Sequence, residues 1–180
     1  MTKIGSTSLT VSGKVGEFQF TSLQQEDLPF LLEVRNECCE FLHDNRCFSL
    51  EEAVDWYMSS KPEYWLILFR GVRIGYFRMS DMSEIHKRAL VGADLHKDFR
   101  GQGLGERAWR AFLEFAFEAF DFHKISLEVL SINQRAMNLY VKLGFMEEGV
   151  KRHDIRRAGK WIDSILMSML RDEFFQTSRN

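Results

Sequence analysis

Three glycines at alternate positions, Gly101, Gly103 and Gly105, constrain the fold of this chain more than any other feature of its sequence. They lie in HKDFRGQGLGERAW, after an apolar segment, ALVGADL, typical of a strand and before an apolar-rich segment, GERAWRAFLEFAFEAF, that favours a helix. Glycine permits backbone dihedral angles that other residues avoid and lets a ligand approach the main chain closely. The pattern therefore predicts a strand, a tight glycine-rich corner and a helix that begins at this corner.

Such a corner is suited to phosphate oxygens. The first N–H groups of a helix have no partner within the helix and lie at the positive end of its dipole, and Lys97 and Arg100 add positive charge nearby. The spacing G-x-G-x-G differs from the G-x-G-x-x-G of dinucleotide-binding folds, and Glu106 stands where a P-loop requires lysine. By itself, the corner indicates either a pyrophosphate site or only a tight connection between strand and helix.

Composition limits the class of protein. The 180 residues are 45% hydrophobic, which is enough for one domain whose core needs no disulfide or metal. The formal charge of −2 argues against nucleic acid as a partner. The sequence shows neither a signal peptide nor a membrane-spanning segment, so we expect a cytoplasmic location and no membrane partner. Residues 1–16 are expected to form a tail or a first strand, residues 17–170 the domain, and residues 171–180 a C-terminal tail.

Three cysteines, Cys38, Cys39 and Cys47, lie near His43 and raise the question of a metal site. Cys38 and Cys39 are adjacent rather than separated by two residues, and no second pair follows, so the spacing does not suit tetrahedral zinc. We therefore expect free thiols in a reducing compartment and no bound metal.

Hydrophobic periodicity predicts alternating strands and helices across the domain. Pro29 in a first turn marks one helix start, and the SLEE capping box at residues 49–52 marks another. Gly144 suits the C-cap of a helix over QRAMNLYVKL. The expected strands cover residues 17–23, 64–69, 73–79, 89–95, 124–130 and 161–170. This order predicts a single mixed α/β domain.

A second motif makes the prediction more specific. Arg100, Gly103 and Gly105 match the Q/R-x-x-G-x-G/A signature of the GNAT superfamily of acyl-CoA-dependent N-acetyltransferases. Further along, LEVLSINQRAMNLYVKLGF resembles that family's strand followed by N-x-x-A-x-x-L-Y-x-K-L-G-F. The two motifs occur in the family's order and spacing. The element order resembles most the branch that contains ribosomal-protein N-terminal, spermidine and nucleotide-amino-sugar acetyltransferases.

The resemblance implies a GNAT-like fold, in which a central mixed, mainly antiparallel sheet is splayed between two parallel strands and flanked by helices. Acetyl-CoA, as co-substrate, would lie where strands 89–95 and 124–130 separate, with its pantetheine amides against the first strand and its pyrophosphate on the glycine-rich amides. Asn133 has an alternative role as helix N-cap only. The residues expected to bind the cofactor are Leu95, Arg100, Gly101, Gln102, Gly103, Leu104, Gly105, Asn133 and Asn138.

By the same resemblance, Tyr140 would protonate the departing thiolate, because family tyrosines at this position lie near the thioester sulfur; packing beneath the cofactor is its alternative role. An alkyl amine has a pKa near 10, so a base must take its proton before attack. Asp94 is the first candidate for this base, and Glu128, His153 and a water chain are alternatives. No acyl-enzyme is needed, so the cysteines are not expected to act as nucleophiles.

The residues expected to bind the acceptor are Arg35, Asn36, Trp56 and Glu128. Basic residues in KRHDIRR suit nucleotide phosphates or form only a solvated hairpin, whereas acidic residues between positions 33 and 44 suit a polyamine. The expected function is direct acetyl transfer to the primary amine of a polyamine, a nucleotide-linked amino sugar or a protein N-terminus. A non-catalytic acyl-CoA sensor is the alternative. An edge strand expected at residues 161–170 leaves a homodimer open.

Overall fold

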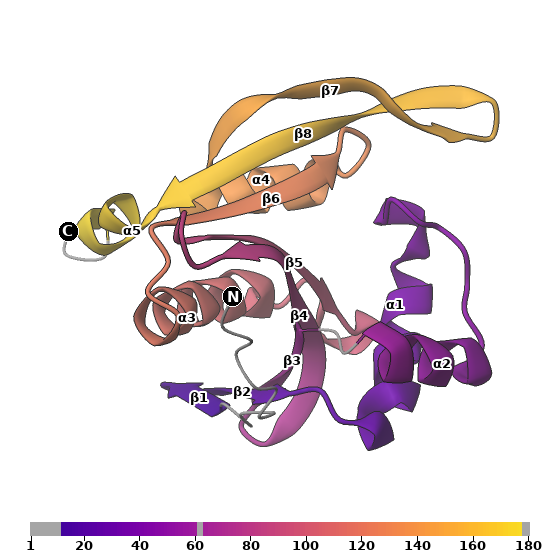
Figure 1. Ribbon diagram of the computed structural model, residues 1–180, viewed down its shortest axis with the longest axis horizontal. Helices are drawn as coiled ribbons and strands as arrows, with labels where there is room; N and C mark the ends of the chain where they lie inside the picture. Colours follow the sequence, from indigo (N-terminus) through magenta and orange to yellow (C-terminus); the bar gives the residue numbers. More distant parts are fainter. Residues whose placement is uncertain (1–11, 61–62, 178–180) are drawn as a thin grey trace, which may run out of the picture.

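The computed structural model describes residues 12–60 and 63–177, and the strands of this part form one eight-stranded sheet in the order β1-β2-β3-β4-β5-β6-β8-β7 (Figure 1). Every neighbouring pair is antiparallel except β5 and β6, which are parallel. This mixed, mainly antiparallel sheet confirms the predicted fold class. The strands are β1 (Ser12–Val15), β2 (Phe18–Ser22), β3 (Glu63–Phe69), β4 (Val72–Ser83), β5 (Arg88–Leu95), β6 (Lys124–Leu130), β7 (Met146–Arg157) and β8 (Lys160–Leu170).

Helices lie on both faces of the sheet. On one face, α3 packs against β4, where the rings of Phe112 and Phe77 stack with centroids 3.8 Å apart. On the other face, α1 packs against β3 and β4, where Leu31 joins Leu66 and Tyr76 in a second buried cluster. The centre of the sheet is therefore buried between two apolar layers. The helices are α1 (Leu28–Glu37), α2 (Leu50–Ser60), α3 (Leu104–Ala119), α4 (Gln134–Leu143) and α5 (Arg171–Thr177).

The predicted helix ends are confirmed by their capping contacts. The Ser49 amide donates to Glu52 Oε2 at 2.8 Å, and the Glu52 amide donates to Ser49 Oγ at 3.2 Å, which completes the capping box before α2. Gly144 ends α4 with a φ of +100°, a conformation that glycine adopts without strain.

The parallel pair β5 and β6 separates along its length. Pairing covers only residues 88–90 of β5 with residues 124–126 of β6, although both strands continue beyond these positions. Residues 91–95 of β5 therefore have no strand partner on the β6 side, and their backbone groups on that side are open to a ligand. This separation is the splay expected from the sequence.

Two details differ from the sequence-based expectations. Strand β8 is not an edge strand, because it pairs with β6 on one side and β7 on the other; the alternation in residues 146–157 was too polar to predict β7 as its cover. Residues 161–170, expected as an exposed edge that a second copy could pair with, therefore have both edges covered by strands of the same chain. Residues 171–177, expected to belong to a tail, form α5, since Phe174 packs into the core beside Phe117.

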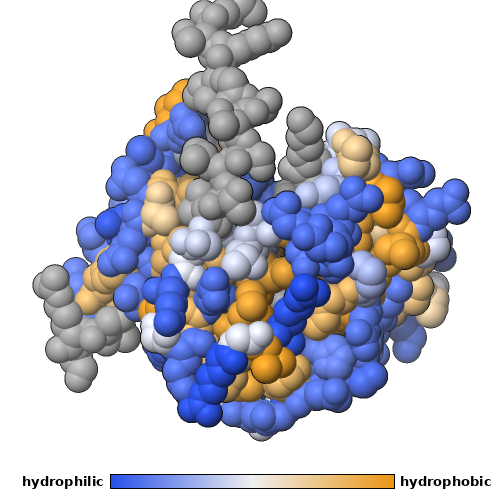
Figure 2. Space-filling model, turned by 90° about the horizontal axis from the view of Figure 1, so that it is seen from below, coloured by the Kyte–Doolittle hydropathy of each residue, from blue (hydrophilic) through white to orange (hydrophobic). Residues whose placement is uncertain are grey.

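The molecular surface in Figure 2 is mostly hydrophilic on the face shown, and hydrophobic side chains appear in several separate groups between polar ones. Across the described residues, no helix has the length and apolar character that crossing a bilayer would require.

Candidate active site

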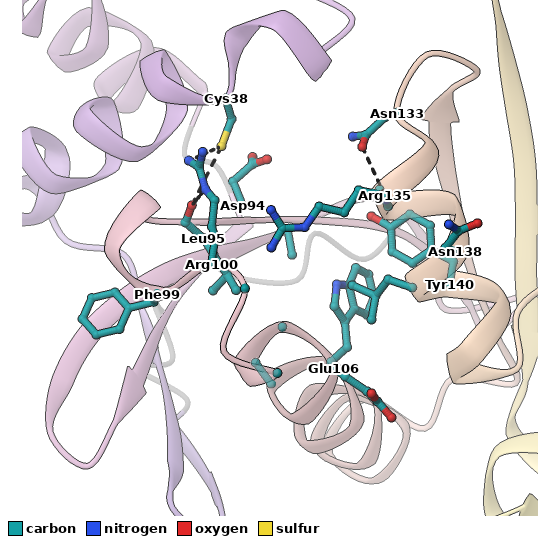
Figure 3. Close-up of a pocket in the computed structure, with 18 of the residues that line it drawn as sticks. Cys38, Asp94, Leu95, Phe99, Arg100, Glu106, Asn133, Arg135, Asn138 and Tyr140 are labelled. Atoms are coloured by element: carbon teal, nitrogen blue, oxygen red, sulfur yellow. Dashed lines mark hydrogen bonds between the residues drawn. The ribbon is translucent and has the colours of Figure 1, made fainter.

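A cavity of about 540 Å³ lies where β5 and β6 separate (Figure 3). Its walls come from the end of β5, the glycine-rich corner, α3, α4 and the segment after α1 that carries Cys38 and Phe41. Nine of the residues predicted from the sequence line it together. They are Asp94, Leu95, Arg100, Gly101, Gly103, Gly105, Asn133, Asn138 and Tyr140.

The glycine-rich corner exposes backbone donors to this cavity. Gly101 and Gly103 have φ values of +80° and +73°, and a Cβ at either position would point into open space. Among the described residues, Arg107 is the first residue at the start of α3 whose amide donates a hydrogen bond to the preceding turn. Its acceptor is the Gly103 carbonyl oxygen, at 3.4 Å. The preceding amides are free to donate to an anion at the positive end of α3.

Arg100 is turned toward the protein rather than toward the glycine amides. Its Nε donates to the Leu95 carbonyl oxygen at 2.8 Å, and one terminal nitrogen lies 3.1 Å from Cys38 Sγ, as the dashed lines in Figure 3 show. Burial raises the pKa of the Cys38 thiol to about 12, so the thiol stays protonated at neutral pH. Arg100 therefore ties the end of β5 to α1, and Cys38 is unsuited to act as a nucleophile.

Tyr140 projects from α4 into the cavity, and its hydroxyl donates no hydrogen bond to any described residue. Its ring is held edge-on by Trp109 and Phe145, with centroid distances of 5.4 and 5.8 Å. Burial raises the pKa of Tyr140 well above its ordinary value, so the phenol carries its proton at neutral pH. The side chain is therefore a fixed proton donor that lacks a partner in the protein itself.

One carboxylate oxygen of Asp94 is already occupied by two donors. Its Oδ2 accepts hydrogen bonds from the Tyr76 hydroxyl at 2.7 Å and from the Arg78 guanidinium at 2.8 Å, and its side chain is 11% exposed. An oxygen held by two donors, one of them cationic, is poorly placed to take a proton from an amine. The base role predicted for Asp94 stays a prediction. The geometry fits better a role in which the Asp94 carboxylate holds Tyr76 and Arg78 in place beside the cavity.

The other predicted cofactor residues divide into two groups. The Asn133 side chain caps α4 by accepting the Ala136 amide at 3.2 Å, the alternative role noted for it, while Asn133 and Asn138 also face the cavity. The side chains of Gln102 and Leu104 do not face the cavity. The Gln102 side chain bonds to the Asp98 carbonyl oxygen at 2.6 Å, and Leu104 is buried in the core.

The residues predicted to bind the acceptor do not line this cavity. Arg35 and Trp56 line a separate cavity of about 350 Å³ between α1 and α2, where Arg35 donates to two carbonyl oxygens of the connecting loop. The Asn36 side-chain amide donates to the Phe48 carbonyl oxygen and accepts from the Phe48 amide, so its observed role is structural. Glu128 forms an ion pair with Lys151 on β7. His153, an alternative base, stacks on Trp161 in the β7–β8 hairpin.

Arg135 was not predicted, although it lies two residues after Asn133 in the second motif. Figure 3 shows its side chain extending from α4 across the cavity, and it forms no ion pair with any described residue. A cation at the second residue of a predicted helix is weak evidence in a sequence, because most such residues only meet solvent. The folded cavity is what distinguishes Arg135 from other surface arginines.

Free amides at a helix N-terminus and a strand edge without a partner meet around one cavity, and they suit a ligand that carries phosphate and amide groups. The comparison with protein families agrees, since residues 18–146 match the model described as acetyltransferase (GNAT) domain. The chain belongs to this family and is an N-acetyltransferase of the GNAT class.

Individual relatives fit this class. The chain is 23% identical over 158 residues to a spermidine N(1)-acetyltransferase of Escherichia coli, covering 84% of this chain and 85% of that protein. It is 24% identical over 108 residues to a provisionally named ribosomal N-acetyltransferase of Bacillus subtilis, covering 60% and 59%. A solved structure of the spermidine N-acetyltransferase of Vibrio cholerae, in complex with CoA and spermine, superposes with a TM-score of 0.78 at 21% identity, covering 88% of this chain and 98% of that one.

Proposed function

We propose that the protein transfers an acetyl group from acetyl-CoA directly to a primary amine while both substrates are bound. The observation that carries this proposal is the single cavity in which free corner amides, the open edge of β5 and the Tyr140 hydroxyl meet. The amides of residues 101–105 would hold the pyrophosphate, the edge of β5 near Leu95 would pair with pantetheine, and Asn133 and Asn138 would contact the cofactor from α4.

Tyr140 would then act on the sulfur. Attack of an amine on the thioester carbonyl breaks the C–S bond and leaves a thiolate, and a protonated phenol is a ready donor to that charge. Alignment of amine and thioester would supply much of the remaining acceleration, because it removes the entropy of bringing them together. No step requires a metal, a nucleic acid or a membrane, and a cytoplasmic location belongs to the same proposal.

A polyamine is the first acceptor to test, with nucleotide-linked amino sugars and protein N-termini as the other classes. Two of the relatives named above act on or bind polyamines by their names. The experiment incubates the protein with acetyl-CoA and spermidine, a nucleotide-linked amino sugar or peptides with free N-termini, and separates free CoA by chromatography. We expect CoA release that depends on one of these amines. Binding of acetyl-CoA without release for every amine would favour a sensor instead.

Replacing Arg135 with alanine should weaken acetyl-CoA binding several-fold, because an unpaired guanidinium in the cavity is placed to meet a cofactor phosphate. Isothermal titration of acetyl-CoA measures the change in Kd. Arg152→Ala, which removes an exposed cation from β7, is the matched control and should leave Kd unchanged. Equal affinities for wild type and Arg135→Ala would show that Arg135 meets only solvent.

A further inference from the structure

Four polar side chains gather beside the opening between β5 and β6, on the face of the sheet opposite α3. His43 comes from the loop after α1, Glu128 from β6, Asp154 from β7 and Ser164 from β8. His43 Nε2 lies 2.9 Å from Ser164 Oγ, 3.6 Å from Glu128 Oε2 and 3.7 Å from Asp154 Oδ2. We call these four residues the His43 cluster.

The hydrogen bonds in the His43 cluster fix which imidazole nitrogen is basic. Ser164 is fully buried, and its single hydroxyl proton goes to Asp154 Oδ2 at 2.7 Å. Its oxygen must therefore accept the proton on His43 Nε2, since both atoms cannot accept in one bond. In neutral His43 the lone pair then lies on Nδ1, which bonds to no described residue. A buried serine and a carboxylate thus orient the ring and hold the basic nitrogen free.

The His43 cluster lies beside the wall of the cofactor cavity. Phe41, two residues before His43, lines that cavity, and Arg157 on β7 bonds to the carbonyl oxygens of Glu40 and Leu42, which holds this loop against the sheet. Glu128 points to the face opposite α3, because its neighbours Leu127 and Val129 are buried in the core on the α3 side. The His43 cluster, which includes Glu128, therefore lies on the face of the sheet opposite α3.

Burial and the surrounding charges keep His43 unprotonated, and so able to accept a proton, at neutral pH. Burial lowers the pKa of His43 most, and the cations Arg78 and Lys151 lower it further, whereas Glu128 and Asp154 oppose this change. Below neutral pH the side chain protonates, and at neutral pH it is a free base. Its side chain is 37% exposed, so a substrate can reach it.

Resting on the acetyl transfer proposed above, we propose that the His43 cluster is the acceptor subsite: the negative charge of Glu128 and Asp154, which lie on the Nε2 side of the ring, attracts a cationic amine to the cluster, and His43 Nδ1 on the other side accepts its proton. Glu128 and Asp154 would also stabilise the imidazolium that forms. Lys151 neutralises part of this charge, so the subsite suits one ammonium group rather than an extended row of cations.

Protons and bonds balance in this scheme. The acceptor ammonium gives one proton to Nδ1, and the freed nitrogen lone pair forms the C–N bond to the thioester carbonyl carbon. The C–S bond then breaks, and the thiolate takes a proton from Tyr140. The second proton on the new amide nitrogen restores the Tyr140 phenol, and the imidazolium releases its proton to solvent.

The test compares wild type with His43→Gln over pH 6 to 10, using whichever amine wild type acetylates. The free-amine fraction rises about tenfold per pH unit toward its pKa near 10. We therefore expect turnover of His43→Gln to be reduced roughly 100-fold near neutral pH and to approach wild type at the alkaline end. Wild type should lose activity only as the pH falls through the lowered pKa of His43. Acetyl-CoA affinity should not change.

Glu128→Gln should raise KM for the amine about tenfold and change kcat less, because it removes negative charge that attracts the ammonium to the cluster. His86→Gln, on the exposed turn between β4 and β5, is the matched control and should behave as wild type. Two results would overturn the subsite. One is a pH profile of His43→Gln that runs parallel to that of wild type over the whole range. The other is a wild-type turnover that EDTA abolishes and manganese restores. Absence of acetyl transfer by wild type with every amine would instead defeat the proposed function.

Discussion

Tyr140→Phe should lower kcat by about ten- to a thousandfold and leave the affinity for acetyl-CoA unchanged. The phenol bonds to no described residue, so its removal costs the folded protein no hydrogen bond, while the ring contacts with Trp109 and Phe145 remain. Because burial holds the pKa of Tyr140 well above its ordinary value, the donor form persists through neutral and moderately alkaline pH. Steady-state kinetics and a titration of acetyl-CoA together measure the two quantities.

Tyr57→Phe is the matched control for this change. The Tyr57 hydroxyl on α2 donates to the Leu23 carbonyl oxygen at 3.3 Å, away from the cofactor cavity, so turnover should not change. If Tyr140→Phe turned over acetyl-CoA as fast as wild type, the phenol would only pack beneath the cofactor. The leaving thiolate would then take its proton from water or from the attacking amine.

Gly103→Glu should weaken acetyl-CoA binding by roughly 100-fold or more while the protein stays folded. The new side chain would extend into the open space at the start of α3 and place a negative charge where the cofactor's pyrophosphate is expected. A side chain at a φ of +73° also costs about 1–2 kcal/mol of backbone strain. Titration of acetyl-CoA measures the affinity, and thermal unfolding measures the strain.

Gly159→Glu separates these two effects. Gly159 lies in the turn between β7 and β8 with a φ of +81° and open space at its Cβ position, so it bears similar strain without facing the cavity. This variant should lose similar stability and bind acetyl-CoA normally. Gly103→Gln, which has the size of the glutamate but no charge, should bind more tightly than Gly103→Glu. If Gly103→Glu bound acetyl-CoA as tightly as wild type, the pyrophosphate could not lie at the glycine-rich corner.

The sequence predicted the local elements well, because their signals are local. The strand over residues 124–130 has the predicted bounds, and the capping box before α2 and the glycine after α4 are used as expected. The two family motifs also predicted the separation of β5 and β6 and nine residues of its cavity. Glycine corners and caps are short-range devices, so a single sequence carries them.

Long-range contacts were harder to predict. Strand β7 is largely exposed and polar, so its sequence lacks the alternation of a half-buried strand, although it covers the edge of β8. Arg100 was predicted to bind the cofactor and add positive charge near its phosphates, yet its guanidinium bonds to Leu95 and Cys38. The His43 cluster joins residues up to 121 positions apart, and nothing local in the sequence marks that meeting. Its partners become visible only once the loop after α1 folds against β6, β7 and β8.

Transfer of labelled acetyl from acetyl-CoA to an amine is the decisive test of direct acetyl transfer. The protein is mixed with acetyl-CoA that carries carbon-13 in the acetyl group and with spermidine, and mass spectrometry follows the label in free amine, in acetylated amine and on the protein. The proposal predicts labelled N-acetylated amine in step with free CoA, no labelled protein intermediate, and loss of the signal in Gly103→Glu. Label that accumulates on a protein side chain would contradict direct transfer, and so would acetylated amine formed equally fast by Gly103→Glu.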